Sequence, residues 1–148
     1  DEVEAVWAVF SASTRVSVAC DYHPDLIERW APVDRDMDEW GQRLRIKNPF
    51  VAVVEERVVG FAEIEETGYI DCFYVHPDFQ GKGIGKALLA TVEAVAIEAG
   101  AEKVFARVSV TARTFFEQMG FTVDEAWNHI VIGLPAPQFG MSKRLADA

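Results

Sequence analysis

The most informative stretch of this chain is VHPDFQGKGIGKAL, residues 75–88. It has the pattern of a strand end, a loop with glycine at every second position from Gly81 to Gly85, and the first turn of a helix. Because glycine has no Cβ, such a loop lets several backbone N–H groups come close to an anion. The helix that follows adds the positive end of its dipole. The stretch therefore predicts a pyrophosphate site.

Two better-known phosphate motifs do not match this loop. A Walker A loop requires Ser or Thr after its Gly-Lys pair, where this chain has Ala87. The dinucleotide fingerprint requires a third glycine three residues after the second, and this chain has none there. The pattern that does match is Gln-x-x-Gly-x-Gly, formed by Gln80, Gly83 and Gly85.

Together with a second segment, this loop resembles the acetyl-CoA loop of the GNAT superfamily of N-acetyltransferases. Residues 112–121, ARTFFEQMGF, are similar to that family's Ala-x-x-Phe-Tyr-x-x-x-Gly-Phe element and follow the loop in the expected order. The resemblance is closest between Phe50 and Phe121. It identifies the chain as a bacterial-type member of the superfamily and implies a single acetyltransferase domain over residues 1–148.

Composition excludes several other classes. With 148 residues, half of them hydrophobic, the chain is long enough to bury a core. Its formal net charge of −10 argues against a nucleic-acid partner, because phosphate backbones demand clustered Lys and Arg. No apolar run of membrane-spanning length and no signal peptide are visible, so we expect a cytoplasmic protein with no membrane partner.

The sequence offers no metal site. Cys20 and Cys72 are far apart and have no metal-binding or redox spacing, which suits a reducing compartment. His23, His76 and His129 are scattered and have no ligand partners at helical or hairpin spacing. We therefore expect no metal cofactor.

Periodicity predicts a mixed α/β (α+β) fold. The predicted strands are residues 50–55, 57–66, 69–75, 103–109, 121–127 and 139–145. The predicted helices are residues 3–20, pieces within 21–47 begun by Asp25 and Asp34, residues 84–99, and residues 111–119. Pro135-Ala136-Pro137 is predicted as the loop between the last two strands. The resemblance implies the GNAT fold, a mostly antiparallel twisted sheet with splayed central strands between helices. We expect no counterpart in this sequence to the first strand of that fold, which was either cut away or never present.

The resemblance also implies how acetyl-CoA would bind. Strands 69–75 and 103–109 would splay apart around the pantetheine arm, which would pair with the backbone of Phe73 and Val75. The residues expected around the pyrophosphate are Gln80, Gly81, Lys82, Gly83, Ile84, Gly85 and Lys86. Ser109 replaces the family's usual Asn, and its hydroxyl would either reach pantetheine or cap the following helix.

The reaction implied is direct attack of an amine on the acetyl thioester within a ternary complex. A base must take the proton of the amine. Asp71 is the first candidate, because it is a carboxylate in mid-strand on the same side as Phe73 and Val75. Glu63 and Glu65 on the preceding strand are alternatives. A paired or solvent-facing carboxylate is an equally good explanation for each of them.

The usual family tyrosine, which protonates the leaving thiolate, is replaced here by Phe116. Since phenylalanine has no proton to give, either Tyr74 serves or the thiolate leaves without a dedicated acid. The replacement keeps an alternative open: a module that binds acyl-CoA, or a partner protein, on the same fold without catalysis.

The acceptor pocket is usually shaped by segments outside the central motifs. Tyr22, Trp30 and His129 are the candidate acceptor-binding residues, and Trp40, Trp127 and Asn128 are further candidate liners. Aromatic side chains in such segments also commonly belong to the core. The acceptor is expected to be an amine of a small molecule or of a peptide, and the protein a monomer or homodimer.

Overall fold

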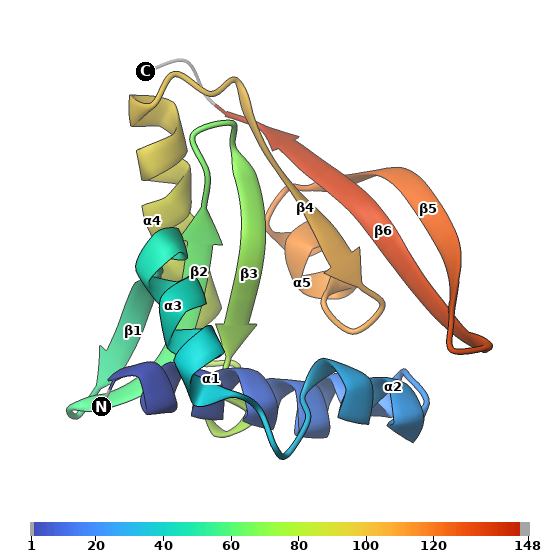
Figure 1. Cartoon of the computed structure of the whole chain (residues 1–148). Coiled ribbons are helices and arrows are strands. Elements are labelled where there is room, and N and C mark those ends of the chain that lie inside the picture. The colour runs from blue at the N-terminus through green and yellow to red at the C-terminus, as the bar shows by residue number, and fades with distance from the viewer. Residues whose placement is uncertain (1, 146–148) are drawn as a thin grey trace.

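The computed structural model describes residues 2–145, which form one six-stranded sheet with helices on both faces (Figure 1). The strands are β1 (Phe50–Val54), β2 (Arg57–Ile64), β3 (Tyr69–Val75), β4 (Lys103–Ser109), β5 (Thr122–Val131) and β6 (Leu134–Arg144). The α-helices are α1 (Glu2–Ala12), α2 (Pro24–Trp30), α3 (Met37–Lys47), α4 (Ile84–Glu98) and α5 (Arg113–Gln118). The short helices are the π-helix η1 (Ser13–Ser17) and the 3-10 helices η2 (Val18–Cys20) and η3 (Pro77–Phe79).

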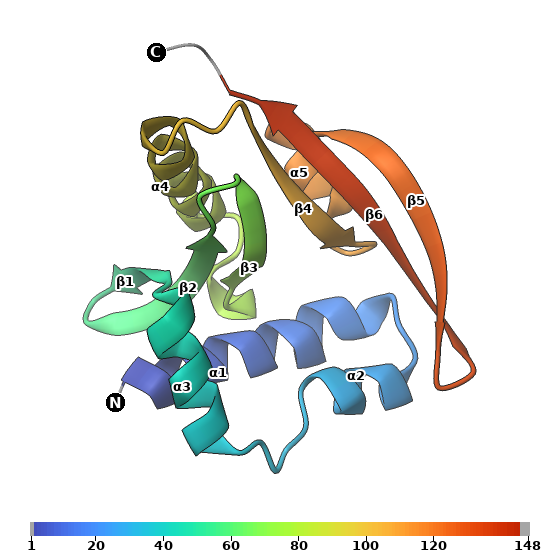
Figure 2. The ribbon, with the colours of Figure 1, turned by 45° about the horizontal axis from the view of Figure 1, so that its top comes forward.

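The strand order is β1-β2-β3-β4-β6-β5, and every neighbouring pair is antiparallel except β3 and β4. The parallel pair is short, since only Tyr69 with Phe105 and Ile70 with Ala106 are in register. Beyond these residues the two strands diverge (Figures 1 and 2). The predicted mixed, mostly antiparallel sheet with splayed central strands is therefore confirmed.

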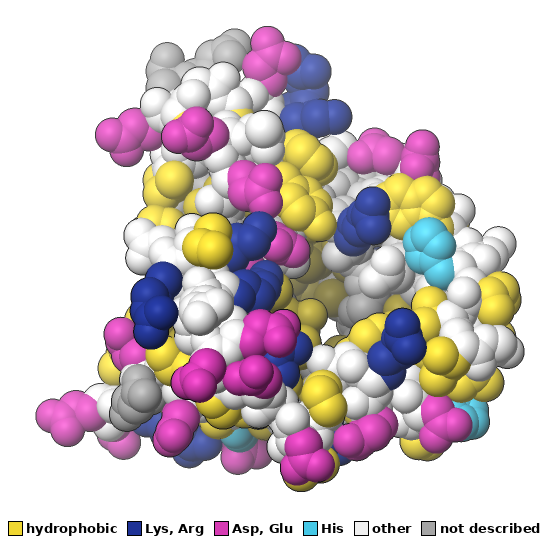
Figure 3. Space-filling model, viewed as in Figure 1, with side chains coloured by type: hydrophobic (Ala, Val, Ile, Leu, Met, Phe, Trp, Pro, Cys, Tyr) yellow, Lys and Arg dark blue, Asp and Glu magenta, His cyan; other side chains and the backbone are white. Residues whose placement is uncertain are grey.

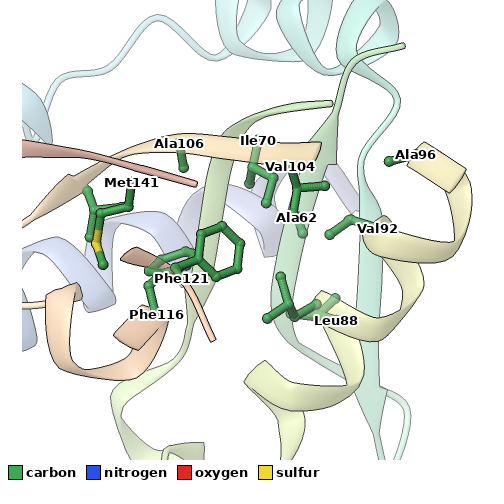
Figure 4. Packing of buried hydrophobic residues seen from close by; sticks show 12 residues of the cluster. Ala62, Ile70, Leu88, Val92, Ala96, Val104, Ala106, Phe116, Phe121 and Met141 are labelled. Carbon is green, nitrogen blue, oxygen red and sulfur yellow. The ribbon is translucent and has the colours of Figure 1, made fainter. Parts of the chain in front are cut away.

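One core lies between the sheet and helices α4 and α5 (Figure 4). Leu88, Val92 and Ala96 recur every four residues on α4, so they form one apolar stripe against the sheet. Phe116 of α5 and Phe121 continue this layer beneath β6. Each large side chain buried here contributes about 1.5–3 kcal/mol.

The opposite face is covered by the N-terminal helices (Figure 2). Val6 and Val9 of α1 pack with Trp40 and Leu44 of α3 against Phe61 of β2. A third cluster joins α2 to the end of the β5–β6 hairpin, and it consists of Tyr22, Leu26, Ile27 and Ala136. The helical segment from α1 to α2 thus runs across the end of the sheet where β3 and β4 have separated.

Both helix starts within residues 21–47 lie two residues away from the predicted ones. His23 begins α2, because its Nδ1 accepts the backbone N–H of Asp25 at 3.0 Å. Asp36 begins α3 by accepting the N–H groups of Asp38 and Glu39. An N-cap side chain must precede the N–H that it binds by two or three residues, so Asp25 and Asp34 were the wrong choices.

The prediction of a loop at Pro135-Ala136-Pro137 was wrong, because these residues lie inside β6. Proline lacks the N–H needed between two strands. Here β6 pairs with β4 only from Gln138 onward, so the prolines have β5 alone as a neighbour. The turn falls instead at Ile132 and Gly133, which have φ of +48° and +75°.

Candidate active site

The glycine loop opens outward in front of α4. Gly81 and Gly83 have φ of +76° and +82°, a left-handed conformation that favours glycine, and no atom lies within 4 Å of where a Cβ would stand on either. Gly83 is the N-cap of α4 and supplies no side-chain cap. The first backbone bond of the helix runs from the N–H of Ala87 to the carbonyl of Gly83 at 3.0 Å. The preceding N–H groups therefore remain available to an external anion.

Gly85 has a different reason to be glycine. A Cβ at this position would lie 3.0 Å from Cε1 of Phe115 on α5. The absent side chain lets the start of α4 approach α5 closely. Alternate glycines thus serve two purposes, open backbone at positions 81 and 83 and helix contact at position 85.

Polar side chains near the loop take several positions. The side-chain amide of Gln80 donates to Oγ of Ser17 in η1 at 3.2 Å, which links the loop to the N-terminal helices. Lys82 lies with Nζ 5.3 Å from the centroid of the Phe79 ring. Lys82 and Lys86 are both exposed and stand beside the free N–H groups of the helix start.

The backbone of β3 faces the gap between the diverging strands. The N–H of His76 donates to the carbonyl of Val59 on β2 at 2.8 Å. Because N–H groups alternate in direction along a strand, those of Val75 and Phe73 point away from β2. Since β4 has already separated from β3 at this level, these groups have no strand partner on that side. Both predicted pantetheine-binding positions thus present backbone groups to the gap, and their role stays a prediction.

A cavity of about 270 Å³ lies in this gap. Its wall includes Phe73 and Tyr74 of β3, Ser109 of β4, and Phe116 of α5. The N-terminal helices close its other side through Phe10, Thr14, Tyr22 and Trp30. The hydroxyl of Ser109 accepts the N–H of Ala112 at 3.1 Å, so it supports the start of α5 while facing the cavity.

A β-bulge in β3 changes which side chains face which way. Ala62 pairs with Phe73 but Ile64 pairs with Ile70, so β3 has one extra residue between these rungs. The bulge turns Asp71 toward α3, whereas Phe73 faces α5 and packs against Phe116 at 5.5 Å between ring centroids. The expectation that Asp71 shares a side with Phe73 was therefore wrong, because strict alternation ends at the bulge.

The carboxylates near the bulge are neutralised by two cations of α3. Arg43 donates to both oxygens of Glu63 at 2.7 Å and lies 3.4 Å from an oxygen of Asp71. Lys47 lies 2.7 Å from Asp71 and 3.1 Å from Glu65. Burial by itself would lower the pKa of Arg43, but its hydrogen bonds with Glu63 and the negative charges of Cys72, Glu63 and Asp71 together outweigh this and raise it. Hydrogen bonds to Asp71 and Glu65 raise the pKa of Lys47.

The three candidate bases differ in their position relative to the cavity. Glu63 is only 1% exposed and does not line the cavity, so its place as a catalytic candidate is not supported by the geometry. Glu65 also lies outside the cavity. Asp71 does line the cavity and is the only carboxylate of residues 2–145 that does so.

Glu63, Asp71 and Cys72 also bring one potential ligand atom each within 4.8 Å of one another. The guanidinium of Arg43 already lies among them, 3.2 Å from Sγ of Cys72. A metal ion would have to displace this cation. The expected absence of a metal cofactor stays a prediction.

Tyr74 reaches the cavity from β3, between the rings of Phe10 and Phe61 at 4.9 and 5.7 Å. Burial raises the pKa of Tyr74 well above its usual value of 10.0, and the nearby Cys72 and Asp71 add to the effect. Its hydroxyl therefore carries a proton at neutral pH. Phe116 shares the cavity wall and has no proton to offer.

Two of the three predicted acceptor-binding residues lie at the cavity, and the third lies away from it. Tyr22 and Trp30 line the cavity and meet edge to face at 5.1 Å. The hydroxyl of Tyr22 accepts the N–H of Val110 at 2.9 Å and donates to the carbonyl of Pro137 at 2.5 Å, so only its ring faces the cavity. His129 is exposed on β5, stacks on Trp127 and lies outside the cavity, which removes it from the site. Of the further candidates, Trp40 is in the core.

Sequence reasoning missed several cavity residues, including Phe10, Thr14, Arg107 and Gln138. Arg107 could have been found, because it lies two positions before Ser109 and therefore on the same face of β4. Gln138 pairs with Ser109 across the sheet, which no local pattern reveals.

Comparison with known proteins agrees with this geometry. Residues 18–131 match the acetyltransferase (GNAT) domain family. The chain is 30% identical over 121 residues to the uncharacterized N-acetyltransferase YafP of Escherichia coli (strain K12), covering 81% of this chain and 75% of that protein. It is 31% identical over 86 residues to an aminoglycoside N(6')-acetyltransferase type 1 of Stenotrophomonas maltophilia, covering 48% of this chain and 56% of that protein.

Solved structures show the same fold. A GCN5-related N-acetyltransferase from Rhodopseudomonas palustris, also described as a class-II aminotransferase, superposes with a TM-score of 0.86 at 27% identity, covering 97% of this chain and 90% of that chain. The PaiA N-acetyltransferase from Thermoplasma acidophilum, solved with coenzyme A, gives a TM-score of 0.74 at 21% identity, covering 97% and 92%.

The sheet opens between the parallel strands β3 and β4, beside a glycine loop and the start of α4, which has no side-chain cap. Together with the fold, these features define the class of acyl-CoA-dependent transferases. The chain belongs to the GNAT family of N-acetyltransferases, and it is an acetyltransferase enzyme. None of the helices in residues 2–145 has both the length and the apolar character needed to cross a membrane.

Proposed function

We propose that this enzyme transfers an acetyl group from acetyl-CoA to a primary amine by direct attack, with both substrates bound together. The observation that carries the proposal is the cavity at the divergence of β3 and β4. One of its walls is the unpaired backbone edge of β3, and the opposite wall is made by α1, η1 and α2. A donor lying along β3 and an acceptor entering past the helices would meet there.

Acetyl-CoA supplies an activated acetyl thioester, and the chain's residues would hold it at two places. The N–H groups from Gly81 to Lys86, with Lys82 and Lys86 beside them, would bind the pyrophosphate. The backbone groups of Phe73 and Val75 that face the gap would bind the pantetheine arm. A free N–H at this edge would also stabilise the negative charge that develops on the carbonyl oxygen.

Two side chains of the cavity fit the proton transfers. Asp71 is the carboxylate that an incoming ammonium would meet, and we assign it the role of accepting the amine proton. Tyr74 is held protonated on the same wall, so it would return a proton to the departing thiolate. In this assignment Tyr74 is the proton donor, a role that Phe116 cannot fill because it has no ionisable proton.

The test is a thiol-release assay with acetyl-CoA and a panel of primary amines, run beside a thermal-shift measurement. Release that requires both the enzyme and an amine supports the proposal. At a ligand concentration of about 100 times Kd, acetyl-CoA should also stabilise the fold by about 2.7 kcal/mol. Stabilisation without thiol release from any amine would overturn the proposal in favour of binding without transfer.

A further inference from the structure

A second hollow lies on the same face of the sheet as the helices that close the cavity. It has a volume of about 720 Å³, and its lining includes Tyr69, Phe105, Glu125 and Trp127. Figure 3 shows this face of the molecule hollowed between the helices and the β5–β6 hairpin. Ala106 and Arg107 of β4 line both this hollow and the cavity between the strands. Arg107 therefore stands where the open hollow meets the reaction cavity.

The guanidinium of Arg107 lies over the indole of Trp127, 5.6 Å from the ring centroid. The intervening residue on β6 is Gly140, which pairs with Arg107, and a Cβ there would lie only 2.7 Å from Cη2 of Trp127. The missing side chain thus gives the two groups room to meet. Stacking occupies the flat face of a guanidinium and leaves its N–H donors free in the plane.

Among residues 2–145, Arg107 has no ion-pair partner and no side-chain hydrogen bond. Other arginines that face a hollow or a core are paired, as Arg43 is with Glu63. Arg107 and Asp71 are the first residues of β4 and β3 beyond the last paired rung, Ile70 with Ala106. The cavity therefore presents a carboxylate from one strand and an unpaired guanidinium from the other.

We propose that Arg107 binds a carboxylate of the acceptor, so that the substrate is a zwitterionic amine of the amino-acid type. Its amine would face Asp71 and its carboxylate would receive the in-plane N–H groups of Arg107, an arrangement that favours a bidentate pair. The inference rests on the proposed function and narrows its acceptor class.

The experiment compares amino acids with their carboxamides in the thiol-release assay at saturating acetyl-CoA. The enzymes are the wild type, Arg107→Gln, Arg107→Lys and Arg45→Ala, the last removing an exposed arginine of α3 as a matched control. For wild type, kcat/KM should be about tenfold or more higher for the amino acid than for its carboxamide. Arg107→Gln should abolish that preference through a raised KM for the amino acid, with the carboxamide unchanged. Arg107→Lys should restore part of it, and Arg45→Ala should match wild type.

Each other outcome is decisive. Equal use of amino acids and carboxamides by the wild type would overturn the inference and leave acetyl transfer standing. If Arg107→Gln lowers kcat/KM equally for the amino acid and its carboxamide, at unchanged far-UV circular dichroism, then Arg107 is a structural residue. That result would also overturn the inference. If no amine of either kind releases thiol while acetyl-CoA still stabilises the enzyme, the proposed function fails and this inference fails with it.

Discussion

Arg43 and Glu63 are joined by two hydrogen bonds of 2.7 Å, which fasten α3 to β2 directly beside the bulge of β3. Removing one partner of such a pair leaves a buried charge without compensation, at a typical cost of 3–5 kcal/mol. Because the Arg43 side chain is 27% exposed, we expect Arg43→Met to lose about 3 kcal/mol of unfolding free energy, measured by urea titration. The double variant Arg43→Met, Glu63→Met should recover part of this loss. If Arg43→Met were as stable as wild type, Arg43 would not be needed to compensate the buried charge of Glu63.

Gly83→Glu should abolish binding of coenzyme A, because it places a carboxylate and a side chain against the predicted pyrophosphate site. It also forces a non-glycine residue to φ of +82°, at a cost of about 1–2 kcal/mol. Gly100→Glu is the matched control, since Gly100 has φ of +87°, equally open surroundings and a place after the other end of α4. Both variants should lose similar stability, and only Gly83→Glu should lose the thermal shift with coenzyme A. Normal binding by Gly83→Glu would refute the loop assignment.

Tyr74→Phe tests the proton donor. We expect kcat to fall about tenfold or more with little change in the affinity for acetyl-CoA. Because burial raises the pKa of Tyr74 above 10.0, the hydroxyl stays protonated and kcat of the wild type should show no loss from this group between pH 7 and pH 10. Phe116→Tyr in the Tyr74→Phe background should restore activity if the cavity accepts an acid from α5. An unchanged kcat in Tyr74→Phe would show that Tyr74 is not the proton donor.

Asp71→Asn tests the proton acceptor, and its turnover should fall more than its affinity for acetyl-CoA. The matched control is Glu65→Gln, because Glu65 also pairs with Lys47 but lies outside the cavity. The measurement is kcat against KM for both substrates. A rate for Asp71→Asn within about twofold of wild type would exclude Asp71 as the base.

The two thiols should differ in reactivity. Cys20 is exposed, whereas burial raises the pKa of the Cys72 thiol to about 12. Since the thiolate is the reactive form, iodoacetamide at pH 8 should modify Cys20 and leave Cys72 unmodified in the folded protein. Mass spectrometry of the native and urea-unfolded enzyme checks this, with Cys20→Ser as control. Modification of Cys72 at the rate of Cys20 would show that the bulge region opens readily.

The raised pKa of Cys72 also sets a pH dependence. The unfolded thiol ionises near its usual value of 9.0, but the folded one does so only near 12. The folded state therefore binds the proton more tightly, and this contribution to stability, complete below pH 9, is lost as the pH rises toward 12. Cys72→Ala should make the unfolding free energy fall less steeply across this window.

Much of the fold could be predicted from local patterns. The β-branched run of β2, the alternation of β4 and the four-residue spacing in α4 can each be read within a few residues of the chain. The glycine loop was equally readable, since positive φ and an open approach require that residue type. The bulge at Asp71 and the strand conformation of Pro135 were not readable, because both depend on which strands lie alongside.

Sequence alone established the sheet class and the family, since these follow from backbone conformation and from motifs that are contiguous in the chain, and it predicted the anion loop. The folded molecule alone reveals that α3 neutralises Glu63, that Asp71 and not Glu63 reaches the cavity, and that Arg107 stands at its edge with no ion-pair partner among residues 2–145. These contacts depend on distances between side chains that are far apart in the chain, such as those of residues 43 and 63. Only the packing of helices on a bulged sheet sets those distances.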